Sequence, residues 1–169
     1  MPGAKDTLVQ FLEAACHYIL YVREVYPAGR DLTWSLQSAD LFEPRRLFNV
    51  PVRMSRHPLL NGYIADVLGA VRPDLEKGVV NKILLSILDE RHTPVEKFTF
   101  QIRSLVEGLT EEQKREAKTS ASTTDIESFF RSFLTKISVC DSMLSPNPPG
   151  SVRSLPSHRV MNVPGLESA

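Results

Sequence analysis

Three stretches of the chain carry apolar residues at helical spacing. The first covers residues 5–26, where apolar positions recur three or four residues apart and neighbouring apolar residues widen the stripe, so we expect a largely buried helix. The second follows Ser55, a plausible cap, and Pro58, which suits a first turn. Pro73 is predicted to kink or end this second helix, and Gly78 marks its limit.

The third helix is predicted to open at a capping box, Thr124-Asp-Ile-Glu127, and to run to Leu144. Three phenylalanines fall within five residues of it, so it is the expected central packing helix of the domain. Its predicted apolar face consists of Ile126, Phe129, Phe130, Phe133, Ile137, Cys140 and Leu144.

Residues 79–103 read as a β-hairpin. Val79 to Leu88 is rich in Val, Ile and Leu, as in a strand covered on both faces, and a polar turn ending at Pro94 follows it. Apolar and polar residues then alternate from 97 to 103, which is typical of a half-buried strand. Residues 50–52 are expected to be extended, with Pro51 confining them to a sheet edge or a short bridge.

Three segments lack a sustained apolar period. Residues 30–47 are interpreted as a long connection, and residues 104–123 as a polar stretch with a short surface helix around 110–117. Residues 151–169 are expected to be an unstructured tail. The order of elements predicts one α+β domain over residues 1–150, with three main helices packed on a small antiparallel sheet.

Composition narrows the functional classes. Twenty Lys and Arg balance twenty Asp and Glu, which argues against broad binding to nucleic acid phosphates. No apolar run approaches the roughly 20 residues that span a bilayer, and the first residues do not resemble a signal peptide. Cys16 and Cys140 lie far apart, which rules out a disulfide framework or a cysteine zinc site. We therefore expect a soluble intracellular domain without a metal or cofactor.

No sequence motif indicates catalysis. The densest polar group is Asp89-Glu-Arg-His92, which lies at an expected hairpin tip where a substrate would be exposed to water. The other residues that could bind a metal or act as a nucleophile have simpler explanations. His17 is expected to be a helix-face residue, His57 part of a helix entry, and both cysteines core residues. The charges of Arg23, Glu24, Arg131 and Lys136 are expected to be solvated. An unrelated small enzyme is thus the least favoured reading, and the open edge of a small sheet favours a peptide-binding module.

Several strings of the sequence resemble the HORMA-domain family. They include residues 11–27, Asn49-Val-Pro-Val-Arg-Met-Ser55, Asn61-Gly-Tyr-Ile64 and Asn147-Pro-Pro-Gly150, and the resemblance covers about 11–29, 48–102 and 129–150. It implies a non-catalytic adaptor that binds an extended peptide as an added strand and folds a C-terminal safety belt over it. The family's peptide-pocket tyrosine falls on Tyr63, and its homodimer surface falls on Glu24, Arg131, Lys136 and Val139.

The strings resemble most the branch of the family that serves DNA polymerase zeta. There the resemblance implies a proline-containing peptide of the polymerase catalytic subunit or of double-strand-break repair-choice proteins as the partner. It also implies roles in translesion synthesis and repair with a link to the mitotic checkpoint, and a nuclear protein that can also occur in the cytoplasm or on the spindle. No direct nucleic acid or membrane contact is expected. The alternative within the family is spindle-checkpoint signalling without polymerase contact.

The resemblance fails in three places. Residues 30–47 replace a shorter, lysine-rich connection of the family, and residues 103–128 match poorly. The likeness stops after Gly150, where the family continues into further strands and the safety belt. The tail that follows is too short to supply the belt. The expectation is therefore a HORMA-like domain without its safety belt, with weakened or regulatory peptide binding. The chain is expected to be a truncated or alternatively spliced form, or the product of an imperfect gene model.

Overall fold

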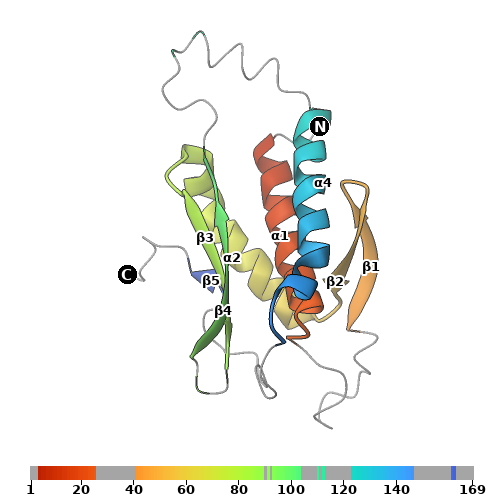
Figure 1. The fold of residues 1–169 in the computed structure, drawn as a ribbon. Helices are drawn as coiled ribbons and strands as arrows, with labels where there is room; N and C mark the ends of the chain where they lie inside the picture. Colours follow the sequence, from red (N-terminus) through yellow and green to blue (C-terminus); the bar gives the residue numbers. More distant parts are fainter. Residues whose placement is uncertain are drawn as a thin grey trace.

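The computed structural model describes residues 4–25, 41–89, 91, 93–103, 110, 112, 123–146 and 161–162. Its longer helices are α1 (Ala4–Val22), α2 (Pro58–Lys77) and α4 (Thr123–Val139), and α4 continues into the 3₁₀ helix η2 (Cys140–Met143). Its strands are β1 (Phe42–Leu47), β2 (Val50–Ser55), β3 (Lys82–Leu88), β4 (Pro94–Gln101) and β5 (Met161–Asn162). The predicted α+β architecture, with helices packed on small antiparallel sheets, is confirmed (Figure 1).

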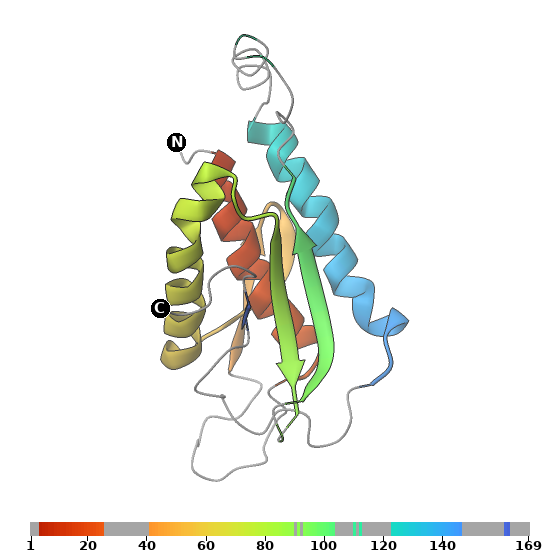
Figure 2. The same cartoon turned by 90° about the vertical axis from the view of Figure 1, so that its left-hand side faces the viewer.

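The central helix is α1. It packs against α2, α4 and β2, and the β3–β4 hairpin crosses in front of it in Figure 2. The prediction that this helix is largely buried is confirmed, because most positions from Phe11 to Leu20 are shielded from solvent. Phe11 joins three elements: its ring stacks on Phe130 of α4 with centroids 4.5 Å apart and meets Phe100 of β4 edge-on at 6.3 Å.

The prediction that the third helix is the central one is wrong. Of its three phenylalanines only Phe130 is buried, whereas Phe129 is 62% and Phe133 is 39% exposed. The buried partner of Phe130 is Leu134, one turn later, which the predicted face omitted. A stripe of positions four and three residues apart, through 126, 130, 134 and 137, faces the core, and this stripe is too narrow to include the other two phenylalanines.

A hairpin of β1 and β2 replaces part of the expected connection over residues 30–47. The two strands pair antiparallel from Phe42↔Ser55 to Leu47↔Val50. Phe48 and Asn49 join them with φ values of 47° and 63°, the doubly left-handed conformation of a two-residue type I′ turn. Prolines at 44 and 51 and three arginines conceal the strand pattern in the sequence; both prolines are tolerated because a two-stranded sheet has open outer edges. Residues 30–40 lie outside the described part of the chain.

Helix α2 runs through Pro73 and ends where Gly78 adopts φ 75°. Gly78 donates its N–H to the Leu75 carbonyl, and Val79 donates to that of Asp74, which satisfies the last carbonyls of the helix. Pro58 occupies the first turn, as expected. The predicted cap at Ser55 is wrong: His57 is the N-cap residue, and Ser55 Oγ instead accepts the His57 N–H at 2.9 Å.

The larger sheet has the strand order β4-β3-β5, and both pairings are antiparallel. The predicted hairpin is confirmed, but β3 is not covered equally on both faces. Its buried residues Ile83, Leu85 and Ile87 alternate with half-buried or exposed positions, because only one face meets the helices. The predicted alternation of β4 is confirmed at Phe98 and Phe100.

The strand β5 was not expected, because it falls in the segment interpreted as a tail. Asn162 pairs with Leu84 and Met161 with Leu85. The other residues of 151–169 lie outside the described part of the chain, as do most of 104–122, where only Thr110 and Glu112 are described. Two predictions therefore fall largely on residues that the structure does not describe. They are the absence of a safety belt at the C-terminal end and the surface helix around 110–117.

Candidate functional site

The sheet edges are the first candidate for a binding site. Strand β4 pairs with β3 over its whole length, and no described strand pairs with the outer edge of β4. On the other side of β3, β5 pairs only with Leu84 and Leu85. A strand edge presents backbone N–H and C=O groups that an extended peptide can pair with. The described sheet can therefore accept a strand on either side.

Tyr63, the predicted peptide-pocket residue, lies on α2. It is half-buried and packs against the hydrophobic core together with Val67, next to the buried Leu60 and Ile64. The helix thus holds the ring at a fixed position while leaving part of its surface open. Its role in binding a peptide stays a prediction.

The residues predicted to form a homodimer surface are all exposed. Arg131, Lys136 and Val139 lie on α4 and Glu24 lies at the end of α1, where its φ is 49°. At about 100° per residue, Arg131 and Lys136 flank Val139 at about 80° and 60° on the helix surface. Val139, which is 53% exposed, points away from the core-facing stripe. The helix therefore presents an apolar centre between two cations.

Both of these cations have contacts within the chain. Arg131 Nε donates to the Phe48 carbonyl at 2.9 Å and so holds the turn between β1 and β2 against α4. Lys136 Nζ lies 5.4 Å from the ring centroid of Phe133. Both side chains remain exposed, so the expectation that they are solvated is compatible with the structure.

Arg23 contradicts the expectation of a solvated charge. Its side chain is 2% exposed and binds three groups: Nε donates to Glu96 Oε2 at 2.9 Å, Nη1 to Asp141 Oδ1 at 2.5 Å and Nη2 to the Ser145 carbonyl at 2.6 Å. Burial alone would lower the pKa of Arg23, but the bonds and charges of Glu96 and Asp141 outweigh burial and raise it. This group, called the Arg23 clasp below, joins α1 to β4 and to the end of η2.

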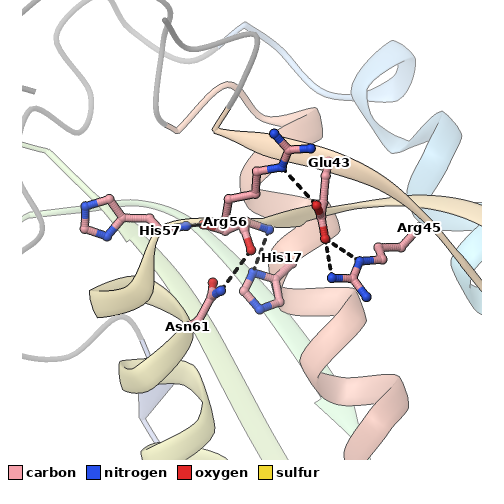
Figure 3. Close-up of polar contacts among 7 residues, drawn as sticks. His17, Glu43, Arg45, Arg56, His57 and Asn61 are labelled. Atoms are coloured by element: carbon pink, nitrogen blue, oxygen red, sulfur yellow. Dashed lines mark hydrogen bonds and ion pairs between the residues drawn. The ribbon is translucent and has the colours of Figure 1, made fainter. Parts of the chain in front are cut away.

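A second polar group joins α1, β2 and α2 (Figure 3). His17 is 1% exposed, and its Nδ1 accepts the Ser55 N–H at 3.4 Å. The Ser55 carbonyl in turn accepts from Asn61 Nδ2 at 2.9 Å. Burial lowers the pKa of His17 to about 4, which keeps the imidazole neutral and able to accept this bond. The predicted helix-face histidine is therefore a buried core residue that positions β2.

Beside this group, Glu43 of β1 binds both Arg45 and Arg56, and its Oε2 lies 2.9 Å from Arg56 Nε. Hydrogen bonds from Arg45 and Arg56 lower the pKa of Glu43. The cluster ties β1 to the segment that leads into α2. Because all three side chains are partly solvent-exposed, it adds little stability by itself.

The candidate groups for catalysis do not form a site in the described residues. Asp89 Oδ1 accepts the N–H groups of Arg91 and Thr93, which builds the turn between β3 and β4. Glu90 and His92, the other members of that cluster, lie outside the described part of the chain. Burial raises the pKa of the Cys16 thiol to about 12, and it also raises the pKa of Cys140, which disfavours the thiolate at both positions.

Two other kinds of site are absent from the described part of the chain. Among the described residues, His, Cys, Asp and Glu never gather in threes with a geometry that would hold a metal ion. The helices of the described ranges are also too short or too polar to cross a membrane.

Comparison with solved structures assigns the fold. The chain superposes on a chain of the Mitotic Checkpoint Complex crystal structure with a TM-score of 0.61 and 17% identity, covering 85% of this chain and 67% of that one. It matches C. elegans HTP-2 bound to a HIM-3 closure motif with a TM-score of 0.60 and 14% identity, covering 98% and 75%. Both are HORMA-domain proteins, and this chain has the HORMA fold that its sequence resembles.

Comparison with curated protein sequences gives relatives of higher sequence identity than these solved structures. The chain is 46% identical to the human Mitotic spindle assembly checkpoint protein MAD2B over 145 residues, 86% of this chain and 60% of that protein. It is 34% identical to the Arabidopsis thaliana DNA polymerase zeta processivity subunit over 144 residues, 84% of this chain and 57% of that protein. The chain is thus a homologue of MAD2B and spans about three fifths of the length of these relatives. No protein-family model matches it.

Proposed function

We propose that this chain is a non-catalytic adaptor that binds an extended peptide as an added strand of its larger sheet. The observation that carries the proposal is a HORMA sheet in which, among the described residues, no strand pairs with the outer edge of β4 and β5 covers only part of the other edge, at β3. A sheet edge supplies backbone hydrogen bonds for a peptide of almost any sequence, and side-chain pockets then select the sequence. Tyr63, held on α2, is the proposed pocket residue.

The proposed partner is a proline-containing peptide of the DNA polymerase zeta catalytic subunit or of a repair-choice protein. The support is the similarity to proteins named as polymerase zeta processivity subunits. The proposed setting is translesion synthesis and double-strand-break repair in the nucleus, without direct contact to nucleic acid or membrane and without a cofactor.

The second candidate function is spindle-checkpoint signalling without polymerase contact. It is favoured by the names of the vertebrate relatives, which are checkpoint proteins. Affinity purification of the tagged chain from nuclear extract separates the two: recovery of the polymerase catalytic subunit supports the first, and recovery of checkpoint proteins alone supports the second.

Replacing Tyr63 by Ala is expected to weaken binding of a polymerase zeta peptide by about tenfold, since an aromatic anchor contributes more than about 1 kcal/mol. Fluorescence anisotropy with a labelled peptide measures the effect. Val67→Ala is the matched control, because Val67 lies one turn later on α2 and is also half-buried against the core. Equal weakening in both variants would mean that Tyr63 acts through packing and not through contact with the peptide.

We also propose that the outward face of α4 forms a homodimer, with Arg131 reaching Glu24 of a second copy. Arg131→Ala should shift the sedimentation coefficient to that of a monomer. Because Arg131 also holds the Phe48 carbonyl within the chain, Val139→Asp provides an independent variant that places a charge at the apolar centre. Arg46→Ala, an exposed arginine on β1, is the control. A dimer that persists in both α4 variants would contradict the proposal.

A further inference from the structure

The first turn of α2 is joined to the end of β2 by hydrogen bonds that replace an ordinary N-terminal cap. His57, the N-cap residue, makes no side-chain cap bond, and Pro58 in the first turn has no N–H to donate. Asn61 Nδ2 instead donates to the Ser55 carbonyl at 2.9 Å, and Ser55 Oγ accepts the His57 N–H at 2.9 Å. Because uncapped helix ends fray, these bonds decide how firmly the start of α2 is held.

Ser55 is a fixed point for this attachment. It is buried, and its N–H donates to Nδ1 of His17 on α1 at 3.4 Å, while its hydroxyl and its carbonyl both bind the start of α2 (Figure 3). It also pairs with Phe42 of β1 across the smaller hairpin. Asn61 therefore ties α2 to a point that α1 and the β1–β2 hairpin hold in place together.

Asn61 and Tyr63 lie on opposite flanks of the core-facing side of α2. At about 100° per residue, Asn61 lies about 60° to one side of the buried Ile64 and Tyr63 about 100° to the other. Apolar packing along that side is not directional, whereas a hydrogen bond is. A rotation of the first turn by about 20° would move a ring about 5 Å from the helix axis by about 2 Å. The Asn61 bond therefore sets the direction in which Tyr63 projects.

The stability of α2 does not by itself explain an asparagine at this position. Asn61 Oδ1 is buried, and no group in the described part of the chain gives it a hydrogen bond. A buried acceptor without a donor costs stability, and an apolar side chain of similar size would avoid that cost. The amide is better explained by what its Nδ2 group does, which is to hold the Ser55 carbonyl.

We propose that Asn61 is a positioning residue for Tyr63. Its bond to the Ser55 carbonyl fixes the rotation of the first turn of α2, and this fixed rotation keeps the tyrosine ring in the orientation that receives a peptide. The proposal deepens the proposed function and rests on it for the peptide, on which Asn61 acts only through Tyr63. The placement of the ring is a property of the chain alone and can be measured without a peptide. Binding constellations tolerate a displacement of only about 0.5 Å, so a movement of about 2 Å would be felt.

Fluorine NMR of the full chain, with fluorotyrosine at its four tyrosines, tests the placement of the ring directly. Tyr63→Phe identifies the Tyr63 signal. Asn61→Leu is expected to shift that signal and to leave those of Tyr18 and Tyr21, which lie on α1, unchanged. Asn61→Asp, whose ionised carboxylate has the same shape but no donor, should act in the same way.

Leu75→Ala is the matched control for this measurement. Leu75 is half-buried against the core about three turns further along α2, so its loss should lower stability without touching the Asn61 bond. A Tyr63 signal that stays in place in both Asn61 variants overturns the proposal. An equal shift in Leu75→Ala also overturns it, because the movement would then follow from loss of stability in general.

A double-mutant cycle tests whether Asn61 acts on the peptide through Tyr63. Asn61→Leu is expected to weaken binding of a labelled polymerase zeta peptide about fivefold, less than removal of the aromatic anchor itself. In a Tyr63→Ala background the same substitution should have little further effect, because residues that act as a unit are not additive. Leu75→Ala should bind like the unaltered chain. Full additivity of the Asn61 and Tyr63 effects would overturn the proposal.

The outcomes separate this proposal from the proposed function. If the Tyr63 signal moves in both Asn61 variants but no protein binds the peptide, the placement of the ring by Asn61 stands and the proposed function is wrong. If the peptide binds the unaltered chain and Asn61→Leu with equal affinity, the adaptor function stands and the positioning role of Asn61 is overturned.

Discussion

Replacing Arg23 by Met is expected to lower the free energy of unfolding by about 3 kcal/mol, the low end of the range for removal of one partner from a buried ion pair. The substitution leaves Glu96, whose side chain is 14% exposed, without its cation, and leaves the Ser145 carbonyl without its donor. Asp141 is 58% exposed, so water can solvate its carboxylate in place of Arg23, and this limits the loss of stability. Urea unfolding followed by circular dichroism measures the change.

The matched control is Arg72→Met. Arg72 also binds two carboxylates, Asp6 and Glu76, but its side chain is 48% exposed, so its loss should cost much less stability than that of Arg23. An equal loss of stability in the two variants would show that burial of the Arg23 clasp does not increase its contribution to the free energy of unfolding. Arg23→Lys should fall between them, because an ammonium keeps the charge but cannot reproduce three bonds from one planar group.

Acidification from pH 7 to pH 4 is expected to remove about 3 kcal/mol of stability through His17. Its pKa is about 4 in the folded chain against an ordinary value of 6.5, so the folded state holds the neutral imidazole. The contribution is complete above pH 6.5 and is lost as the pH falls towards 4, because the unfolded chain takes up the proton first. Protonation would also place a hydrogen on the Nδ1 atom that accepts the Ser55 N–H.

Comparison with His17→Asn isolates this contribution. The Asn side chain can accept the same bond but does not titrate, so the variant should be less stable at pH 7 and should lose about 3 kcal/mol less on acidification. The carboxylates, including Glu43 with its lowered pKa, titrate in both proteins and cancel in the difference. Parallel stability curves for the two proteins would rule out His17 as the titrating group.

The sequence correctly predicted the elements in which the spacing of the apolar residues matches the side that is buried. Helix α1 and strand β4 follow this rule, because each is buried along the face that its period marks. Strand β3 was predicted from a continuous apolar run to be covered on both faces, but its alternating burial shows that only one face is covered. The prediction also failed at α4, where Phe129 and Phe133 suggested burial by their size although Leu134 fills the core. Aromatic content alone does not say which side of a helix is covered; the spacing of 126, 130, 134 and 137 carried that information.

The polar sites were harder to predict for a different reason. Arg23 binds Glu96 and Asp141, which lie 73 and 118 residues further along the chain, so no local pattern brings them together. His17 likewise meets Ser55 across 38 residues. A charged residue on a buried helix usually lies on its solvated side. Only the tertiary structure shows whether such a residue is instead buried against a partner of opposite charge. Tyr63 and the α4 surface were instead found by resemblance, and their roles stay predictions.

The Arg23 clasp also bears on the order in which the chain folds. Its bonds close chain segments of 73, 118 and 122 residues, and contacts so distant in sequence form only after the elements between them are placed. An interaction that is absent from the transition state changes the unfolding rate and leaves the folding rate nearly unaltered. We therefore expect the clasp to set how long the end of η2 stays attached to β4, with little influence on how quickly the chain reaches its native structure.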